Sequence, residues 1–300
     1  MKVTRTLLAL GCGIFLLLAV SLAHAVEIGP NPTSTLLNGN GPFSVSSSSV
    51  SSWVSGFGGG TIYYPTASGQ YGVIAVCPGY TGTSSSISWF ARRLATHGFV
   101  TIAMNTNSRF DFPDSRATQL AAALNYLLNS SSSTIRSRIR TADRGVAGHS
   151  MGGGGTLRAS ERDSNLKVGI PLTPWHTDKT WGSLSVPQMI FGADGDTVAP
   201  ASSHARTFYN SIPSSTKKAY ALLNNASHFT PNSTDERIGR YGVAFAKRFV
   251  DGDTRYEPFL CGAEHSTYAT SWKFDTYLST CPYGGGSEPE PDYPWWYWWR

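Results

Sequence analysis

Residues 148–152 read Gly-His-Ser-Met-Gly, and three more glycines follow at 153–155. The residues before this G-x-S-x-G stretch, 144–147, read as a short buried strand, and residues 156–160 after it read as the start of a helix. A strand, a sharp turn and a helix are the context of a nucleophile elbow, in which the turn lifts the hydroxyl of Ser150 above the sheet edge. The flanking glycines fit, because such a strained turn excludes side-chain bulk two positions from the serine. The alternative is a glycine-rich loop with an incidental serine, so the rest of the chain must supply a base, an acid and an oxyanion hole.

Outward from this stretch, apolar strand-like runs alternate with amphipathic helix-like segments. Such alternation predicts an α/β fold with a mostly parallel sheet, helices on both faces and, because no long insertion interrupts it, no cap domain. Ligands of such sheets bind beyond the carboxyl ends of the strands, so the loops after residues 77, 147, 193 and 223 are expected to converge on an open site. Strands are expected at 43–54, 61–65, 71–77, 99–104, 144–147, 167–172, 186–193 and 217–223, and helices at 84–97, 114–129, 156–160, 201–209 and 234–249.

The two ends of the chain differ from its middle. Lys2 and Arg5 precede an apolar run at 7–20, and Ala-His-Ala closes residues 1–25. This pattern predicts a secretory signal peptide cleaved after Ala25, and the apolar run is shorter than the roughly 20 residues of a membrane-spanning helix. We therefore expect a secreted protein with no membrane span.

The catalytic domain is expected to occupy residues 26–283. Residues 284–300 read as a Gly/Pro linker followed by a tail rich in tryptophan. For this tail two interpretations stay open: a disordered end, or an adhesive patch for an apolar or carbohydrate surface.

Charge and cysteine content narrow the class of protein. Of the 24 Lys and Arg residues two leave with the signal peptide, so 22 basic residues face 19 acidic ones and the net charge is +3. Such a small excess without basic runs argues against nucleic-acid binding.

Cys261 and Cys281 are expected to pair in an exported protein, whereas Cys77 lies in an apolar run and is expected to be a buried free thiol.

Chemistry at Ser150 requires a histidine base and a carboxylate that orients it. The chain order of α/β hydrolases is serine, acid, histidine. His228 directly follows an expected strand and is the favoured base. Asp196 follows the strand that ends at residue 193 and is the favoured acid, with Asp194 as its rival.

An oxyanion hole needs two backbone N–H groups aimed at the developing negative charge. One is expected from Met151, the residue after the nucleophile. The other is expected from Tyr80, in the Pro-Gly-Tyr-Thr-Gly turn that ends the strand at 71–77.

Beyond the elbow itself, several short motifs resemble the bacterial cutinases, a family that includes the poly(ethylene terephthalate) hydrolases. The resemblance spans roughly residues 30 to 282 and implies the α/β-hydrolase fold. It also implies Ser150, Asp196 and His228 as catalytic triad and Tyr80 and Met151 as oxyanion hole. The motifs are Pro-Gly-Tyr at 78–80, Asn-Thr-Asn-Ser at 105–108, Pro-Asp-Ser-Arg at 113–116, Pro-Trp-His at 174–176 and Ser-His-Phe at 227–229.

The same resemblance implies a substrate groove and identifies departures from the family pattern. Some polyester-degrading members carry Trp before the nucleophile and Ser after the catalytic histidine; here those positions are His149 and Phe229. Some members have a second disulfide near the site, but the corresponding positions here, 193 and 230, are not cysteine. The residues expected to line the groove are Tyr80, His149, Met151, Trp175 and Phe229.

No cofactor is expected to be required. The resemblance implies a stabilising Ca²⁺ site at Asp194, Asn224 and Asp275, weakened because one of the three side chains is an amide.

The sequence thus predicts a secreted, monomeric serine ester hydrolase that acts on polyesters such as cutin, at an insoluble surface. A triacylglycerol lipase or a general short-chain carboxylesterase is the close alternative. A different class, a surface-binding module in which the aromatic tail is the active part, is the third hypothesis.

Overall fold

The computed structural model describes residues 26–284, and within that range nine strands form one sheet of order β1-β2-β4-β3-β5-β6-β7-β8-β9. Strands β3 to β8 pair in parallel, whereas β1, β2 and β9 add antiparallel edges. The predicted mostly parallel α/β-hydrolase sheet is confirmed. The strands are β1 (Val45–Val50), β2 (Gly60–Pro65), β3 (Tyr71–Cys77), β4 (Phe99–Met104), β5 (Ile139–His149), β6 (Val168–Leu172), β7 (Gln188–Ala193), β8 (Lys218–Leu223) and β9 (Phe274–Ser279).

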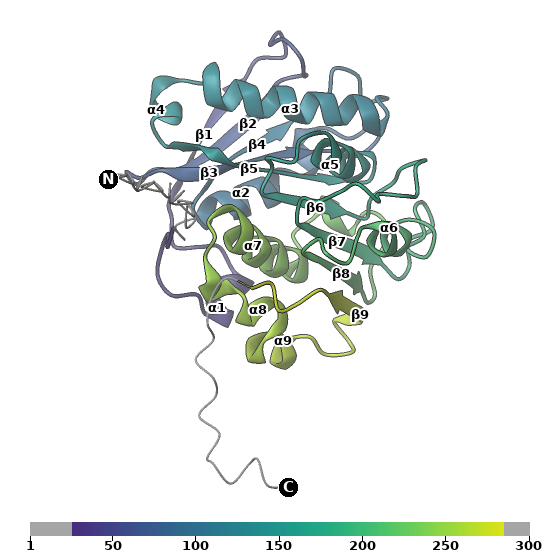
Figure 1. Cartoon of the computed structure of the whole chain (residues 1–300). Helices are drawn as coiled ribbons and strands as arrows, with labels where there is room; N and C mark the ends of the chain where they lie inside the picture. Colours follow the sequence, from purple (N-terminus) through teal and green to yellow (C-terminus); the bar gives the residue numbers. More distant parts are fainter. Residues whose placement is uncertain (1–25, 285–300) are drawn as a thin grey trace, which may run out of the picture.

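Helices cover both faces of this sheet. Figure 1 shows α3 and α5 above the sheet and α2 and α7 below it. The helices are α1 (Ser34–Asn38), α2 (Ser88–Thr96), α3 (Pro113–Asn129), α4 (Ser133–Arg136), α5 (Met151–Arg162), α6 (Ala205–Ser211), α7 (Glu236–Val250), α8 (Pro258–Cys261) and α9 (Ala263–Tyr268), with short 3₁₀ turns at Ser84–Ser86, Thr230–Asn232 and Thr254–Tyr256.

The central strand β3 shows how the sequence builds two cores. Its seven residues are all buried, and successive side chains of a strand point to opposite faces. Val73 and Ala75 accordingly join the core under α3 and α5, whereas Ile74 and Val76 join the core under α2 and α7. A strand that is apolar at every position is thereby fixed at the centre of the sheet.

Local signals explain where the long helices begin. Pro113 occupies the first turn of α3, where its missing N–H costs nothing. The Asp235 side chain caps α7 by accepting from the N–H groups of Arg237 and Ile238. Gly98, at φ +94°, follows α2 and allows the sharp turn into β4.

Several elements differ from the sequence expectation, among them helix α5, which begins at Met151 and not at 156. Strand β5 is longer than 144–147, because its first residues pair with β3 before a register shift. The expected helix at 201–209 begins only at Ala205, and four turn residues precede it. The C-terminal elements α8, α9 and β9 were not predicted, because each has only four to six residues and too short a hydrophobic pattern to detect.

The C-terminal region is held to the domain by the disulfide between Cys261 and Cys281, as predicted. Cys77 is a buried free thiol, also as predicted. The predicted signal peptide and all of the tail after Gly284 lie outside the described residues. Among residues 26–284, no helix is long and apolar enough to cross a membrane.

One buried histidine predicts how stability depends on pH. His97, which follows α2, is 2% exposed and donates its Nε2 proton to the Gly39 carbonyl. Burial, helped by the nearby charge of Arg93, lowers the pKa of His97 from its ordinary value of 6.5 to about 3. The unfolded chain thus takes up a proton at a higher pH than the folded one, and stability falls as pH drops below the unfolded value.

We expect the free energy of unfolding, measured by urea denaturation from neutral pH to about pH 5, to decrease below pH 6.5. In His97→Gln, which keeps a side-chain donor, this slope is expected to be shallower by up to about 1.4 kcal/mol per pH unit. Equal slopes in the two proteins would show that His97 is not the group responsible.

Candidate active site

Ser150 occupies the sharp turn between β5 and α5. Its backbone is left-handed, with φ 54° and ψ −119°, which is strained for a residue with a side chain. Its N–H donates to the Leu172 carbonyl at 2.9 Å, and its carbonyl accepts from the N–H groups of Gly154 and Trp175, each at 2.9 Å. Strand β6, the loop after it and helix α5 therefore hold the strained turn in place.

The glycines two residues before and two residues after Ser150 are required by close packing. A Cβ atom added to Gly152 would lie 2.4 Å from the carbonyl oxygens of both Cys77 and Pro78, and one added to Gly148 would lie 2.4 Å from the Gly152 carbonyl oxygen. These distances are far below van der Waals contact. Helix α5 can therefore approach the carboxyl end of β3 only with glycine at position 152.

Three side chains from three strand-end loops meet in a hydrogen-bonded line. His228 Nε2 lies 2.8 Å from Ser150 Oγ, and His228 Nδ1 lies 2.8 Å from Asp196 Oδ2. Asp196 follows β7 and His228 follows β8, so the parallel strand order brings both to Ser150 at the end of β5. All three side chains are at least nine-tenths buried.

The carboxylate of Asp196 is held in its ionised form. Burial opposes ionisation, but hydrogen bonds from His228 and from the N–H groups of Ala199 and Val198 outweigh it and hold the pKa of Asp196 below its ordinary value. An ionised carboxylate at Nδ1 keeps that nitrogen protonated, which leaves Nε2 free to accept the Ser150 proton.

His228 is positioned through its main chain as well. Its carbonyl accepts a hydrogen bond from His149 Nε2 at 2.8 Å and another from Thr173 Oγ1 at 3.1 Å. His149 is 3% exposed, and burial, with the neighbouring His228, lowers its pKa to about 4. His149 was expected to line the groove. Its ring is instead buried and acts as a neutral hydrogen-bond donor to the main chain of His228.

The two expected oxyanion donors lie on either side of Ser150. Met151 is the next residue in the chain, and Gly79, which precedes Tyr80, packs so close that an added Cβ would lie 3.1 Å from Ser150 Cβ. Among residues 26–284, neither the Tyr80 N–H nor the Met151 N–H donates to a protein acceptor. Both are free to bind a substrate oxygen.

Exposed aromatic side chains surround the serine. Tyr80 and Phe229, both expected in the groove, are 47% and 60% exposed. Phe110 and Phe112, which no sequence motif indicates, are similarly exposed and pair with Tyr80 and Trp175 at ring-centroid distances of 5.6 and 6.2 Å. They lie in a polar loop before α3, where no periodicity marks them.

Trp175 is supported from behind. His204, which precedes α6, is 9% exposed and stacks on Trp175 at a ring-centroid distance of 6.3 Å with an interplanar angle of 26°. Phe208 packs edge-on against His204. The indole is therefore backed by the His204 ring, which in turn packs against Phe208.

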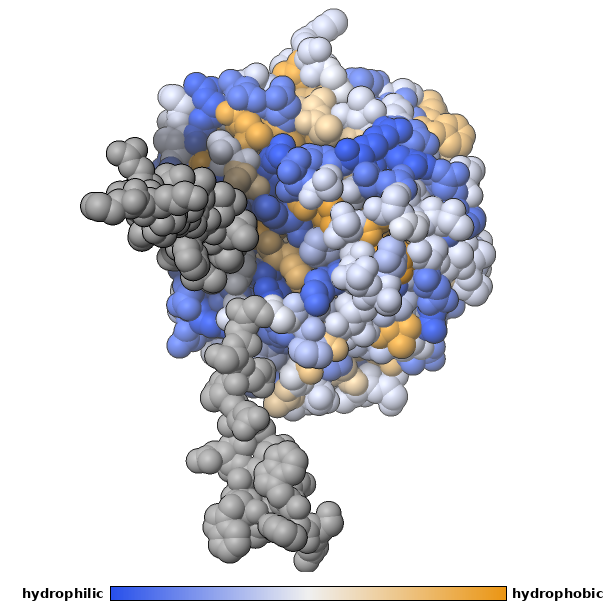
Figure 2. Space-filling view, viewed as in Figure 1, coloured by the Kyte–Doolittle hydropathy of each residue, from blue (hydrophilic) through white to orange (hydrophobic). Residues whose placement is uncertain are grey.

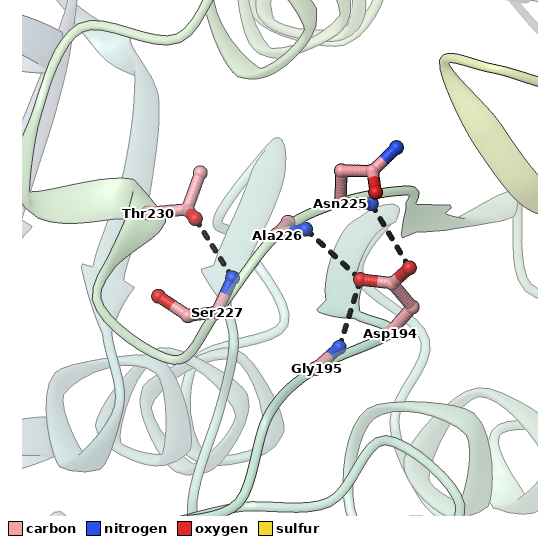
Figure 3. A pocket seen from close by; sticks show the side chains of 6 residues that line it. All are labelled: Asp194, Gly195, Asn225, Ala226, Ser227 and Thr230. Atoms are coloured by element: carbon pink, nitrogen blue, oxygen red, sulfur yellow. Dashed lines mark hydrogen bonds between the residues drawn. The ribbon is translucent and has the colours of Figure 1, made fainter.

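Asp194 has a different role from Asp196. Its carboxylate accepts from the N–H groups of Gly195, Asn225 and Ala226 at 2.8–2.9 Å, so it fixes the loop after β8 that carries His228 (Figure 3). These bonds, against the opposing effect of burial, hold the pKa of Asp194 below its ordinary value. Asp194 also borders an open hollow of about 620 Å³, which Ser227 and Thr230 line on the other side.

Two of the three residues of the implied calcium site, Asp194 and Asn224, take part in local hydrogen bonds. Ca²⁺ takes about six to eight oxygen ligands, yet three N–H groups already engage Asp194. Asn224 uses its Oδ1 to accept from the Asn225 N–H and its Nδ2 to bind the Ser271 carbonyl. Asp275 is exposed, and residues 26–284 contain no cluster of three or more His, Cys, Asp or Glu side chains suited to a metal.

One face of the surface is mainly hydrophilic. Figure 2 shows hydrophilic residues over most of this face and hydrophobic residues in small separate groups. Scattered apolar residues of this kind are ordinary on a protein surface, so the face in Figure 2 suggests no further apolar site.

Comparisons with known proteins agree with this geometry. A family model described as PET hydrolase-like matches residues 20–282. The chain is similar to Cutinase est1 of Thermobifida alba, at 56% identity over 87% of this chain and 88% of that protein. It is also similar to a cutinase of Thermobifida fusca (54%, covering 89% and 91%) and to bis(hydroxyethyl) terephthalate hydrolase of Streptomyces coelicolor (50%, covering 86% and 83%).

The close packing at Gly152 can be tested directly. In Gly152→Ala the new methyl group must displace the Cys77–Pro78 backbone, so we expect a lower melting temperature and a lower kcat for a soluble ester. Gly182→Ala is the matched control, because nothing lies within 4 Å of the Cβ position at Gly182. Equal behaviour of the two variants would contradict the packing argument.

The two aspartates can be separated by conservative substitution. Asp196→Asn removes the charge that orients His228, and we expect kcat to fall by up to about 10⁴-fold. Asp194→Asn disturbs only the loop, so a smaller loss is expected together with a lower melting temperature. A larger loss of kcat in Asp194→Asn would reverse the assignment of the acid.

Proposed function

Because the chain belongs to the PET hydrolase-like family, we propose that it hydrolyses polyesters through an acyl-enzyme intermediate on Ser150. It is a carboxylic ester hydrolase, like the cutinases it resembles. The observation that carries the proposal is the hydrogen-bonded line from Ser150 Oγ through His228 to Asp196.

In the first half of the reaction, Ser150 Oγ attacks the ester carbonyl while His228 Nε2 takes its proton. Asp196 stabilises the imidazolium that forms, because its carboxylate accepts from Nδ1. The N–H groups of Tyr80 and Met151 bind the oxyanion of the tetrahedral intermediate. Collapse of this intermediate transfers the proton from His228 to the leaving alcohol and leaves the acyl group on Ser150.

In the second half, water replaces the alcohol. His228 takes a proton from that water, which attacks the acyl carbonyl and forms a second oxyanion in the same hole. The proton then returns to Ser150 Oγ, and the carboxylic acid product is released. Water is the only co-reactant in this cycle.

The aromatic surroundings of Ser150 favour a polymer with apolar or aromatic units. Tyr80, Phe110, Phe112, Trp175 and Phe229 offer ring faces and edges that can pack against an acyl group. Exposed apolar groups gathered at an active site are typical of a binding surface. Cutin and terephthalate polyesters are therefore the favoured substrates, and a triacylglycerol lipase or a short-chain carboxylesterase is the alternative.

The cellular setting follows from the same proposal. A polyester is insoluble and too large to enter a cell, so the enzyme acts outside the cell at the polymer surface, as a secreted monomer. The signal-peptide pattern at residues 1–25 supports export.

The triad proposal predicts large kinetic effects. Ser150→Ala and His228→Ala are each expected to lower kcat for p-nitrophenyl butyrate by about 10⁴- to 10⁶-fold, with the folded structure retained by circular dichroism. Because the groups act as a unit, the double variant is expected to lose little more than either single one. Near-normal turnover in either single variant would sink the assignment.

The substrate proposal predicts a selective effect of the aromatic loop. In Phe110→Ala and Phe112→Ala, release of soluble products from a polyester film is expected to fall several-fold more than turnover of p-nitrophenyl acetate, which has no chain to bind. Trp53→Ala is the control, since Trp53 is 93% exposed and lies in the loop between β1 and β2.

The same enzymes are then tested on tributyrin, cutin and an aromatic polyester film. A parent enzyme active on tributyrin but inert on both polymers would favour the lipase alternative. Equal losses on the film and on the acetate would show that the aromatic loop does not bind the chain.

A further inference from the structure

Arg116, in the first turns of α3, is a fully buried cation that the proposed reaction does not use. Its side chain has no exposed surface, and within residues 26–284 no carboxylate forms an ion pair with it. Burying a charge without a counterion costs free energy. A residue kept in this state calls for an explanation from its contacts.

Those contacts are three backbone carbonyls that belong to two loops. Nη1 donates to the Pro78 carbonyl at 3.0 Å, Nη2 to the Arg109 carbonyl at 3.0 Å and Nε to the Asp111 carbonyl at 2.7 Å. Pro78 lies two residues before Tyr80, whereas Arg109 and Asp111 flank Phe110. One rigid guanidinium therefore joins the loop of the expected oxyanion donor to the aromatic loop.

Tyr80 is bracketed by this arrangement. On its N-terminal side Pro78 is held by Arg116. On its C-terminal side the Thr81 N–H donates to the Arg109 carbonyl at 2.8 Å, which is the same oxygen that Arg116 binds. Thr81 has φ 60°, a conformation that a side-chain-bearing residue rarely adopts and that needs support from its surroundings.

We propose that Arg116 is a positioning residue, which fixes the Tyr80 N–H in the oxyanion hole and ties the aromatic loop at Phe110 and Phe112 to it. The proposal rests on the proposed function, since it assigns Arg116 a role in that same reaction. The planar fork supplies three hydrogen bonds in fixed directions, and a lysine, with one flexible ammonium group, cannot reproduce them.

The position of Arg116 also explains its neighbours on α5. A Cβ added to Gly155 would lie 2.9 Å from Arg116 Cβ, so the glycine run after Ser150 lets α5 pack directly on the first turns of α3. The buried charge is felt within the site, since Arg116 is among the groups that lower the pKa of His149, after burial and His228.

A matched control exists elsewhere in the fold. Arg240 in α7 is also completely buried. It binds Asn38 Oδ1 and Ser34 Oγ at 2.8 and 3.0 Å and lies over the Tyr268 ring, against α1 and α9. Substitution of either arginine removes a buried guanidinium, but only Arg116 contacts the loops at Ser150.

The experiment compares Arg116→Lys, which keeps the charge, and Arg116→Met, which removes it, with Arg240→Lys. Turnover of p-nitrophenyl butyrate is measured well below each melting temperature and referred to folded enzyme. Loss of an oxyanion donor costs about 10²- to 10³-fold in kcat, so a displaced donor is expected to cost about 10- to 100-fold with little change in KM. Arg240→Lys is expected to lower the melting temperature and leave kcat unchanged.

A second readout isolates the oxyanion hole. Phenylboronic acid forms a tetrahedral adduct with a catalytic serine, so its Ki is expected to rise in the Arg116 variants by the factor by which kcat/KM falls. Parent-like kcat in Arg116→Lys, an equal loss in Arg240→Lys, or an unchanged boronate Ki would each overturn the proposal. Turnover by the parent enzyme tests the proposed ester hydrolysis itself. The proposed function and the proposed role of Arg116 can therefore fail independently of each other.

Discussion

The left-handed backbone of Ser150 is the constraint on which the rest of the site depends. A side-chain-bearing residue at φ 54° is strained. It is held there because its N–H donates to the Leu172 carbonyl of β6 and its carbonyl accepts from the N–H groups of Gly154 in α5 and of Trp175. Gly148 and Gly152 are needed because α5 packs against the carbonyls that end β3. The turn projects the Ser150 hydroxyl out of the sheet edge and leaves the next N–H free for an oxyanion.

The parallel sheet then determines what can meet this hydroxyl. Strands β7 and β8 lie successively to one side of β5 and β6, and their carboxyl ends carry Asp196 and His228. Two sets of hydrogen bonds hold these loops in place. The Asp194 carboxylate accepts from three N–H groups in the turns after β7 and β8. His149 and Thr173 both donate to the His228 carbonyl. On the other side of β5, strand β3 delivers the Tyr80 loop, which Arg116 joins to the aromatic loop before α3.

Much of this arrangement could be predicted from the sequence, because the strands are apolar and the strand-end loops carry the polar residues. The strands β3 and β4 have the expected bounds, and the side chains of Ser150, Asp196 and His228 are in hydrogen-bond contact on loops that were expected to converge. What escaped depends on tertiary contacts. Phe110 and Phe112 lie in a polar loop, and the buried His149 ring donates to the main chain of His228 instead of lining the groove. The local hydrogen bonds of Asp194 and Asn224 are likewise contacts that no single sequence reveals.

The central claim is that Ser150 becomes acylated, with His228 as its base. The most direct measurement is rapid acid quenching of the enzyme during turnover of p-nitrophenyl butyrate, followed by peptide mass spectrometry. We expect a butyryl group on the peptide that contains Ser150, accumulating in the parent protein and absent from His228→Ala. A butyryl group on another residue, or none on Ser150 while the ester is being hydrolysed, would contradict the claim.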